Sequence, residues 1–414
     1  MRAGSLWSHP EFLKLWGAYT VSRLGSQITL LALPLTAVLL LGAGATETGL
    51  LVAARSASSI LPGPFLGAWV DRRSRKPILV GANVASAIVI GSVPVAAMLG
   101  VLTIGQLYVV AYLAGVLSTA GELARSAIMP GLIGRERLVA ANSSMQASGA
   151  FTQIAGPSLG GALVQALSAP IAMAFDAASF VVSAAALAVL RVREVIAPRE
   201  EGRRIWHDAV EGFAFVRGQD VLFRSIVAIG LANIEWFAVL ALLVVYATDE
   251  LHMPPALLGV AIAAVGPATL VGAAVAGPLI RALGLGRVMI VALTFEAVSR
   301  LILPFASGGE VQVAVVVGVT QALVGFTEAL WFISSRTLQQ AVTPDHLQGR
   351  VGAAVYFVAF VVAPPAALGA GILGDAIGLR PTLFLAGVIA VVALGYLVSS
   401  AGVRGLRSAP AASS

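Results

Sequence analysis

Residues 67–76 read Gly-Ala-Trp-Val-Asp-Arg-Arg-Ser-Arg-Lys and lie between two long apolar runs, near 47–70 and 78–100. The turn is strongly basic, whereas each neighbouring run is long enough to cross a bilayer as a helix. A basic turn between two such runs is typical of two membrane helices joined on the cytoplasmic side. The segment therefore predicts that the chain crosses a membrane and returns.

The rest of the chain has the same character. Of its 414 residues, 58% are hydrophobic and 11% are charged. A soluble domain carries about 25% charged residues, so lipid must be the main solvent of this chain. Its apolar runs are long and unbroken, unlike the alternating strands of a β-barrel. We expect an all-α membrane protein.

Twelve apolar runs, separated by charges, turns and loops, are the candidate transmembrane helices. They lie near 13–41, 47–70, 78–100, 104–124, 139–167, 170–190, 222–248, 255–280, 287–306, 311–335, 351–374 and 379–402. The first run is too long for the core of a signal peptide, so we expect it to be retained as a helix.

Basic residues predict the orientation. With the N-terminus inside, 22 of the 26 Arg and Lys residues fall in cytoplasmic segments, three lie within spans and Arg380 alone falls outside. The positive-inside rule then places both termini in the cytoplasm, in the plasma (inner) membrane. Basic loops beside membrane spans also account for the net charge of +6, and we expect no nucleic-acid partner.

A polar stretch at 191–220 divides the chain into a bundle at 1–190 and a bundle at 221–414, which ends in a short cytoplasmic tail. We interpret the stretch as a cytoplasmic linker with a short amphipathic helix around residues 205–216. The halves resemble each other at a shift of about 210 residues: segment 67–71 falls opposite 277–281, 125–130 opposite 336–341, and 156–161 opposite 364–371. This order predicts two pseudo-symmetric six-helix bundles, a layout typical of transporters.

Two motifs resemble those of the major facilitator superfamily. Residues 67–76 are similar to its signature G-x-L-A-D-R-x-G-R-K and depart from it at Trp69, Val70 and Ser74. Gly149 followed by Gly156-Pro157 and Gly160-Gly161 is similar to the G-P-x-x-G-G pattern of its exporters. The chain resembles the branch that contains macrolide-efflux and enterobactin-export proteins. The resemblance implies the major facilitator fold and export of a small molecule.

The first motif is a candidate gate, made by Gly67, Asp71, Arg72, Arg75 and Lys76. The resemblance implies that its loop latches the cytoplasmic side against span eleven. Our hypothesis is that Asp71 caps the start of span eleven near 349–351, with Arg125 as an ionic partner. The alternative is that the basic residues only anchor the topology. The second motif is interpreted either as an antiporter-like bend at Pro157 or as tight packing of small residues.

A charge at membrane depth costs about 2.5–3.5 kcal/mol on insertion scales, so each ionisable residue within a span is a candidate functional residue. Arg23, Glu122, Glu235 and Glu328 fall on spans one, four, seven and ten, which line the central cavity in the superfamily. Glu235, with Asn233 and Trp236 beside it, is the leading candidate for proton exchange, and Glu328, with Trp331 one turn away, is the second. Arg23 could hold a carboxylate ionised, bind an anionic group or form a structural pair.

The remaining intramembrane charges are interpreted as structural. Glu122 and Arg125 are spaced i,i+3, and Glu296 and Arg300 are spaced i,i+4, so each pair can neutralise itself. Asp176 lies near the outer end of its span and could reach the interface. Arg55 could form a buried packing pair in span two.

No other chemistry is indicated. The sequence has no cysteine, no metal-ligand spacing among its four histidines and no phosphate-binding loop, so we expect neither an enzyme, a metal nor a cofactor. The expected function is efflux of amphipathic or cationic molecules by a monomer that exchanges them for protons across the membrane. The alternatives are an exporter of a siderophore or other metabolite, whose anionic groups would favour Arg23 and Arg55 as ligands, an importer of the same fold, a membrane enzyme, or a non-transporting membrane protein.

Overall fold

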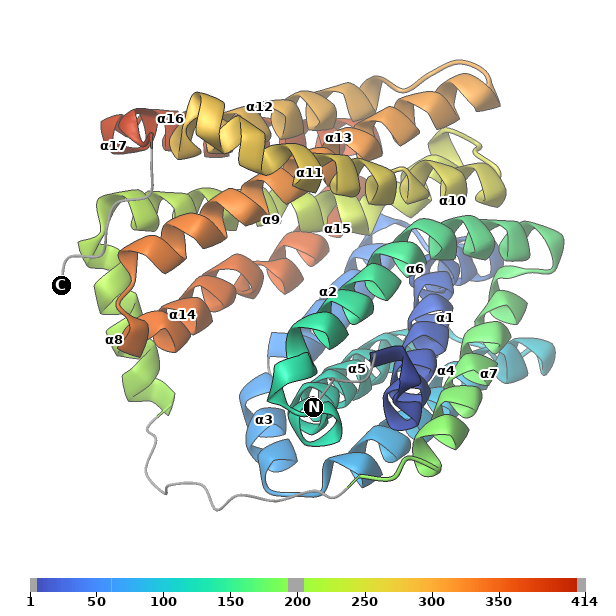
Figure 1. Ribbon diagram of the computed structural model, residues 1–414. Coiled ribbons are helices and arrows are strands. Elements are labelled where there is room, and N and C mark those ends of the chain that lie inside the picture. The colour runs from blue at the N-terminus through green and yellow to red at the C-terminus, as the bar shows by residue number, and fades with distance from the viewer. Residues whose placement is uncertain (1–5, 61, 193–204, 408–414) are drawn as a thin grey trace. The chain divides into compact units, whose positions relative to one another are not determined.

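The computed structural model describes residues 6–60, 62–192 and 205–407, and within these it contains helices and no strand. The all-α prediction is confirmed. The first part of the chain forms α1 Pro10–Leu41, α2 Ala45–Ile60, α3 Gly63–Asp71, α4 Arg75–Met98, α5 Ile104–Ile133, α6 Leu138–Ala166 and α7 Ala169–Ala188, with short turns η1 Leu6–Ser8 and η2 Arg135–Arg137 (Figure 1).

The second part continues with α8 Ile205–Gly218, α9 Asp220–Val245, the π-helical turn η3 Tyr246–Glu250, α10 Pro255–Ala263, α11 Val265–Leu283, α12 Leu285–Ile302, η4 Leu303–Phe305, α13 Glu310–Val342, η5 Asp345–Leu347, α14 Gln348–Val361, α15 Ala363–Ile377, α16 Leu379–Val398 and α17 Ala401–Gly405. Helix α8 is the amphipathic helix expected in the linker. The linker residues 193–204 lie outside the described part of the chain.

Ten helical segments of the described residues are long and apolar enough to cross a membrane. The two other expected spans are also helical. One is α6, which contains the polar run Asn142-Ser-Ser in its second turn and is not among those ten segments. The other is the pair α2 and α3, which is interrupted near Pro62. Twelve crossings therefore stay a prediction.

Three predicted spans are each divided into two helices, which the apolar patterns did not indicate. The breaks lie near Pro62, at Ala264 and at Val362. Pro267 follows the second break and Pro364 the third. A proline removes a backbone donor and its ring collides with the carbonyl four residues earlier, which favours a break at these positions. Proline alone does not cause one, since Pro34, Pro94, Pro130, Pro157 and Pro278 lie inside continuous helices.

The helices group into two compact units. The first contains the described residues up to 192 together with Pro254–Ala263, so α10 belongs to it. The second contains 205–253 and 264–407. The segment Pro254–Ala263 is thus grouped with the first unit, although the sequence division at 191–220 assigns it to the second bundle.

Both units have the same packing order. In the first, α1 packs on α6 and α7, α4 packs on α5 and α7, and α2 packs on α5. In the second, α9 packs on α15 and α16, α12 packs on α13 and α16, and α11 packs on α13. Numbered by expected span, each unit joins its first helix to the fifth and sixth, its third to the fourth and sixth, and its second to the fourth. The repeat predicted from weak sequence matches is therefore visible as a repeat of contacts.

Helix α6 carries the glycines of the antiporter-like motif on two faces. A Cβ added to Gly156 would lie 2.2 Å from the Cβ of Gln27 on α1, and a Cβ at Gly160 would lie 3.3 Å from the Cα of Ile28. A Cβ at Gly161 would lie 2.3 Å from the carbonyl oxygen of Pro255 and 3.1 Å from the Cα of Gly259, both on α10. The motif thus lets α6 approach two helices closely at once.

Gly149 makes a matched control, because a Cβ there would meet only the Tyr19 hydroxyl at 3.7 Å. We expect Gly161→Ala to lower the free energy of unfolding by about 1–3 kcal/mol, the cost of overpacking. Gly149→Ala should be neutral or raise stability by up to about 1 kcal/mol, since alanine favours the helix. Thermal unfolding of both variants in detergent measures the difference, and equal melting temperatures would contradict the close packing of α6 on α10.

Arg380, near the start of α16, connects this helix to η3 and to the turn around η4 in the second unit. Its Nε donates to Glu250 Oε2 at 2.7 Å, and its two terminal nitrogens donate to the backbone oxygens of Pro304 at 3.0 Å and Ala306 at 3.2 Å. The guanidinium also lies 5.6 Å from the centre of the Tyr246 ring. In the sequence, Arg380 was the one basic residue assigned to an outside loop. The structure shows that it holds neighbouring segments of the second unit together.

Replacing Arg380 by alanine leaves two backbone oxygens and one carboxylate without these partners. We expect the free energy of unfolding to fall by about 1–3 kcal/mol. Arg281→Ala, at an exposed position at the end of α11, should change it by less than about 0.5 kcal/mol. Denaturation of the two variants in the same detergent tests this. An unchanged free energy of unfolding for the Arg380 variant would contradict a stabilising role for its three hydrogen bonds.

Candidate functional site

The centre of the second unit contains a buried ion pair. Glu235 on α9 and Arg300 on α12 are both almost completely buried, and their Oε2 and Nε atoms are 2.6 Å apart. The contact is an ion pair by distance, but neither the Glu235 carboxylate oxygens nor the Arg300 Nε has a hydrogen-bond partner with good geometry among the described residues. Arg300 also lies 5.3 Å from the centre of the Trp236 ring.

This pair corrects one prediction. The i,i+4 spacing suggested that Arg300 is neutralised by Glu296, one turn earlier on α12. The carboxylate in contact is instead that of Glu235, from a helix far away in the sequence. Glu296 remains close enough to act electrostatically on Glu235. Arg300 therefore has one carboxylate in contact and a second within reach on its own helix.

A pocket lies beside this pair, within the second unit, and encloses about 1310 Å³ of space including its open mouth. Its acidic and aromatic lining comes from four helices: Asn233 and Trp236 of α9, Glu296 of α12, Glu328, Trp331 and Arg336 of α13, and Tyr356 and Phe360 of α14. Glu235 and Arg300 are not part of the lining. The prediction that Glu235 lines the cavity is therefore wrong, since its side chain is completely buried and does not reach the pocket surface.

The pocket wall combines exposed carboxylate with aromatic surface. Glu328 is exposed, Glu296 is partly exposed, and Trp331 is largely buried. Glu296 and Arg300 both act electrostatically on Glu328. The rings of Tyr356 and Phe360, also in the lining, have centres 4.6 Å apart and are tilted by 35°. A cation with flat aromatic surface fits such a lining, because carboxylates attract its charge and rings stack on it.

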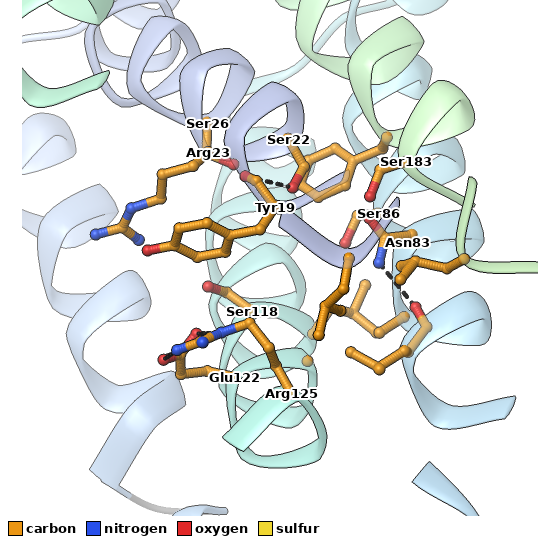
Figure 2. A pocket seen from close by; sticks show the side chains of 17 residues that line it. Tyr19, Ser22, Arg23, Ser26, Asn83, Ser86, Ser118, Glu122, Arg125 and Ser183 are labelled. Atoms are coloured by element: carbon orange, nitrogen blue, oxygen red, sulfur yellow. Dashed lines mark hydrogen bonds and ion pairs between the residues drawn. The ribbon is translucent and has the colours of Figure 1, made fainter. Parts of the chain in front are cut away.

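The first unit has a second, more polar pocket between α1, α4, α5 and α7 (Figure 2). Arg125 and Glu122 form an ion pair, with Arg125 Nε donating to Glu122 Oε2 at 3.0 Å, as their i,i+3 spacing predicts. The Arg125 guanidinium also lies 4.8 Å from the centre of the Tyr19 ring. Arg23, Ser26 and Ser118 belong to the same lining.

Asp176 does not reach an interface, and this expectation is wrong. Its side chain is completely buried on α7 against Gly25 of α1, where an added Cβ would lie 2.5 Å from its Oδ1. The Ser179 hydroxyl donates to Oδ1 at 3.3 Å. Arg55 was expected to form a buried pair, but its side chain is exposed and it interacts with Asp176 only through the electric field.

The gate motif spans the end of α3 and the start of α4, so Arg72 caps α3 and Arg75 begins α4. The side chain of Asp71 lies outside the described residues, and its capping role stays a prediction. Trp69, one of the departures from the signature, stacks against Arg73 at 5.6 Å. At the start of α14, Arg350 pairs with Glu211 of α8. The described partners of Arg125 are Glu122 and Tyr19.

Sequence reasoning missed two features of the second unit, the aromatic pair of the pocket lining and the ion pair beside the pocket. Tyr356 and Phe360 are spaced i,i+4 in a helix otherwise rich in alanine and valine, and this aromatic spacing was the available signal. The partnership of Glu235 with Arg300 had no local signal, because it joins helices distant in the sequence.

Comparison with known proteins agrees with this architecture. The sequence description of the Major Facilitator Superfamily matches residues 15–366. The multidrug efflux pump Tap of Mycolicibacterium fortuitum is 28% identical over 398 residues, which cover 92% of this chain and 95% of the pump. Two solved structures share the fold at low identity. The nucleoside transporter NupG aligns with a TM-score of 0.77 at 12% identity, over 94% of this chain and 98% of its own.

A bacterial homologue of the iron transporter ferroportin, in an inward-facing state, aligns with a TM-score of 0.74 at 18% identity, over 95% of this chain and 99% of its own. The family match covers most of the chain, and the two units repeat one packing order. The chain is a multi-pass integral membrane protein that belongs to the major facilitator superfamily of transporters.

Proposed function

We propose that this transporter exports amphipathic, cationic small molecules from the cytoplasm in exchange for protons. The observation that carries the proposal is the pocket of the second unit, which brings Glu296 and Glu328 together with Trp331, Tyr356 and Phe360. The relative Tap, a multidrug efflux pump, supports the same direction and substrate breadth. We further propose that both termini are cytoplasmic, in the inner membrane, and that the protein acts as a monomer.

In this proposal Glu328 is the substrate-binding carboxylate. It is exposed in the pocket and has Trp331 one turn away on the same helix. A carboxylate and a ring at this spacing attract a flat cation by charge and by its contact with the π face. Because the aromatic walls make few directional hydrogen bonds, they tolerate many shapes, as broad specificity requires.

Proton coupling is assigned to Glu235, Arg300 and Glu296. In the observed arrangement Arg300 neutralises Glu235, which leaves Glu296 on the pocket wall with no ion pair to any residue that the structure describes. When a proton neutralises Glu235, the buried guanidinium loses its counter-charge, and a buried unpaired charge is costly. Glu296, four residues earlier on α12, is the nearest replacement on the same helix face. Arg300 would then cancel a carboxylate of the pocket and weaken its hold on a cation.

In this exchange, Glu235 takes up a proton as the pocket releases its cation. The two units would provide the alternating access, with the glycines of α6 limiting leak and Asp71 holding the cytoplasmic gate. The bundles proposed for this motion are 1–190 and 221–414, joined by the linker 191–220. In this proposal the carboxylates of the pocket lining select cations. The buried pair of Glu235 and Arg300 couples cation release to proton uptake.

Ethidium transport in proteoliposomes tests the proposal. We expect wild type to move ethidium faster when a pH gradient is imposed. Glu328→Gln should weaken ethidium binding by about tenfold, the loss of one charged contact. Glu235→Gln should abolish the acceleration by the gradient, since the amide cannot exchange the proton. Glu310→Gln, at an exposed position in the first turn of α13, is the matched control and should behave as wild type.

Two results would contradict the proposal. The first is full gradient-driven efflux in the Glu235 and Glu328 variants, singly and together. The second is a wild-type protein, monodisperse in detergent, that neither moves ethidium nor dissipates a proton gradient in its presence.

A further inference from the structure

One face of α13 lines the pocket of the second unit over about three turns and carries opposite charges near its two ends. The lining residues of this helix are spaced i, i+3, i+4, i+7, i+8 and i+11, which is one face of an α-helix. They are Glu328, Trp331, Phe332, Ser335, Arg336 and Gln339. Glu328 binds the cation in the proposed function, whereas that proposal gives no role to Arg336.

The Arg336 guanidinium has no carboxylate in contact among the residues that the structure describes. Its side chain is exposed, and its guanidinium carbon lies 5.5 Å from the centre of the Phe332 ring, which is also in the lining. Other arginines of this unit are paired, as Arg224 is with Asp220. Arg336 is therefore a positive charge of the pocket wall that no contact neutralises.

The corresponding arginine of the first unit shows what is missing here. The internal repeat places Arg125 opposite Arg336. Arg125 is neutralised by Glu122, three residues earlier on the same helix face. The residue three positions before Arg336 is Ile333. The second unit thus has the arginine without the carboxylate, and the guanidinium is available to a bound anionic group.

A buried amide lies next to Arg336 on this face. Gln339, three residues later, is only 5% exposed and belongs to the pocket lining. A Cβ added to Gly352 would lie 3.5 Å from its Nε2, so the amide nitrogen is close to the wall formed by α14. Within the described part of the chain this amide makes no hydrogen bond. Because an unpaired buried amide is costly, a bound acceptor would be stabilised there.

The two opposite charges are separated by the length of a small molecule. Eight residues along α13 separate Glu328 from Arg336, a rise of about 12 Å. The guanidinium lies back over Phe332, four residues nearer to Glu328, as expected for helix side chains that lean toward the N-terminus. The charged groups are therefore about 6–12 Å apart. A flat aromatic cation that carries a carboxylate on its ring system has its charges at such a spacing.

We propose that Arg336 and Gln339 bind a carboxylate of the exported cation, so that the pocket prefers a zwitterionic solute to a purely cationic one. This inference rests on the proposed function, because Glu328 must hold the cationic end. A guanidinium and an amide nitrogen at i and i+3 supply donors for both oxygens of a carboxylate. Arg336 also repels a solute that carries positive charge alone, which adds to the discrimination.

Two dyes that differ only at one carboxyl group test the proposal. Tetramethylrhodamine is a zwitterion at neutral pH, and its methyl ester is a cation with the same ring system. Fluorescence polarisation with the full-length protein in nanodiscs of zwitterionic lipid, corrected with empty nanodiscs, measures both affinities. We expect wild type to bind the acid about tenfold more tightly than the ester, the effect of one charge-assisted contact. Arg336→Gln should weaken binding of the acid about tenfold without weakening that of the ester.

Three further variants define the contact. Arg336→Lys should keep part of the preference, since lysine keeps the charge without the planar fork. Gln339→Met has a similar length without the amide and should weaken binding of the acid alone, by about fivefold, the loss of one hydrogen bond. Arg281→Gln removes an exposed arginine of the same unit outside the pocket lining and should bind both dyes as wild type. Retained binding of the ester shows that a variant is folded.

The outcomes separate this inference from the proposed function. Glu328→Gln should weaken binding of both dyes, because both carry the cation. If the ester binds and depends on Glu328, but the acid has no advantage or keeps its advantage in Arg336→Gln, the preference for zwitterions is wrong and cation binding stands. Arg336 would then only anchor the cytoplasmic end of α13. If neither dye binds wild type, or if Glu328→Gln changes neither affinity, both proposals fail. If Arg336→Gln binds neither dye, the lysine and Gln339 variants decide.

Discussion

A buried ion pair ties two helices together because either charge, left alone in an interior of low dielectric constant, would cost several kcal/mol. Glu235 and Arg300 impose this constraint on α9 and α12, and Trp236 seals it with its ring. The pocket next to the pair takes its shape from the same helices. In the proposed function, a change in the charge of Glu235 is answered by Arg300, whose alternative carboxylate, Glu296, lines the pocket. This arrangement is the basis for the proposed coupling between the buried pair and the open pocket.

The repeated architecture supports different chemistry in each unit. Helices α1 and α9 occupy the same place in the packing order, as do α5 and α13. In the second unit these helices contribute Glu328, Arg336 and two tryptophans to the pocket, whereas in the first they contribute Glu122, Arg23, Arg125 and several hydroxyl groups. The glycines of α6 then matter as spacers, because they let one helix contact α1 and α10 at backbone distance. The two units thus share a packing order and differ in the residues that line their pockets.

Interactions within one helix were predictable from the sequence, and interactions between distant helices were not. Apolar runs located the helices, and the i,i+3 spacing predicted the pair of Glu122 and Arg125. The same local reasoning failed for Arg300, because a contact with Glu235 depends on how α9 packs on α12. The same reasoning failed for Asp176, because it considered only how near the residue lies to the end of its span. It did not take into account that Gly25 lets α1 pack closely against Asp176. A proline lies at or just after each of the three breaks, but other helices contain a proline without breaking, so the apolar patterns treated each span as continuous.

The central claim is that Glu235 exchanges a proton when a cation enters the pocket. A pH indicator in weakly buffered detergent, mixed with purified protein and saturating ethidium, measures this exchange directly. For wild type equilibrated at a pH at which Glu235 is protonated, the account predicts release of about one proton per bound ethidium, as expected when one group changes its protonation on binding, and none from Glu235→Gln. Equal proton release from the two proteins, or ethidium binding by wild type without any release, would contradict it.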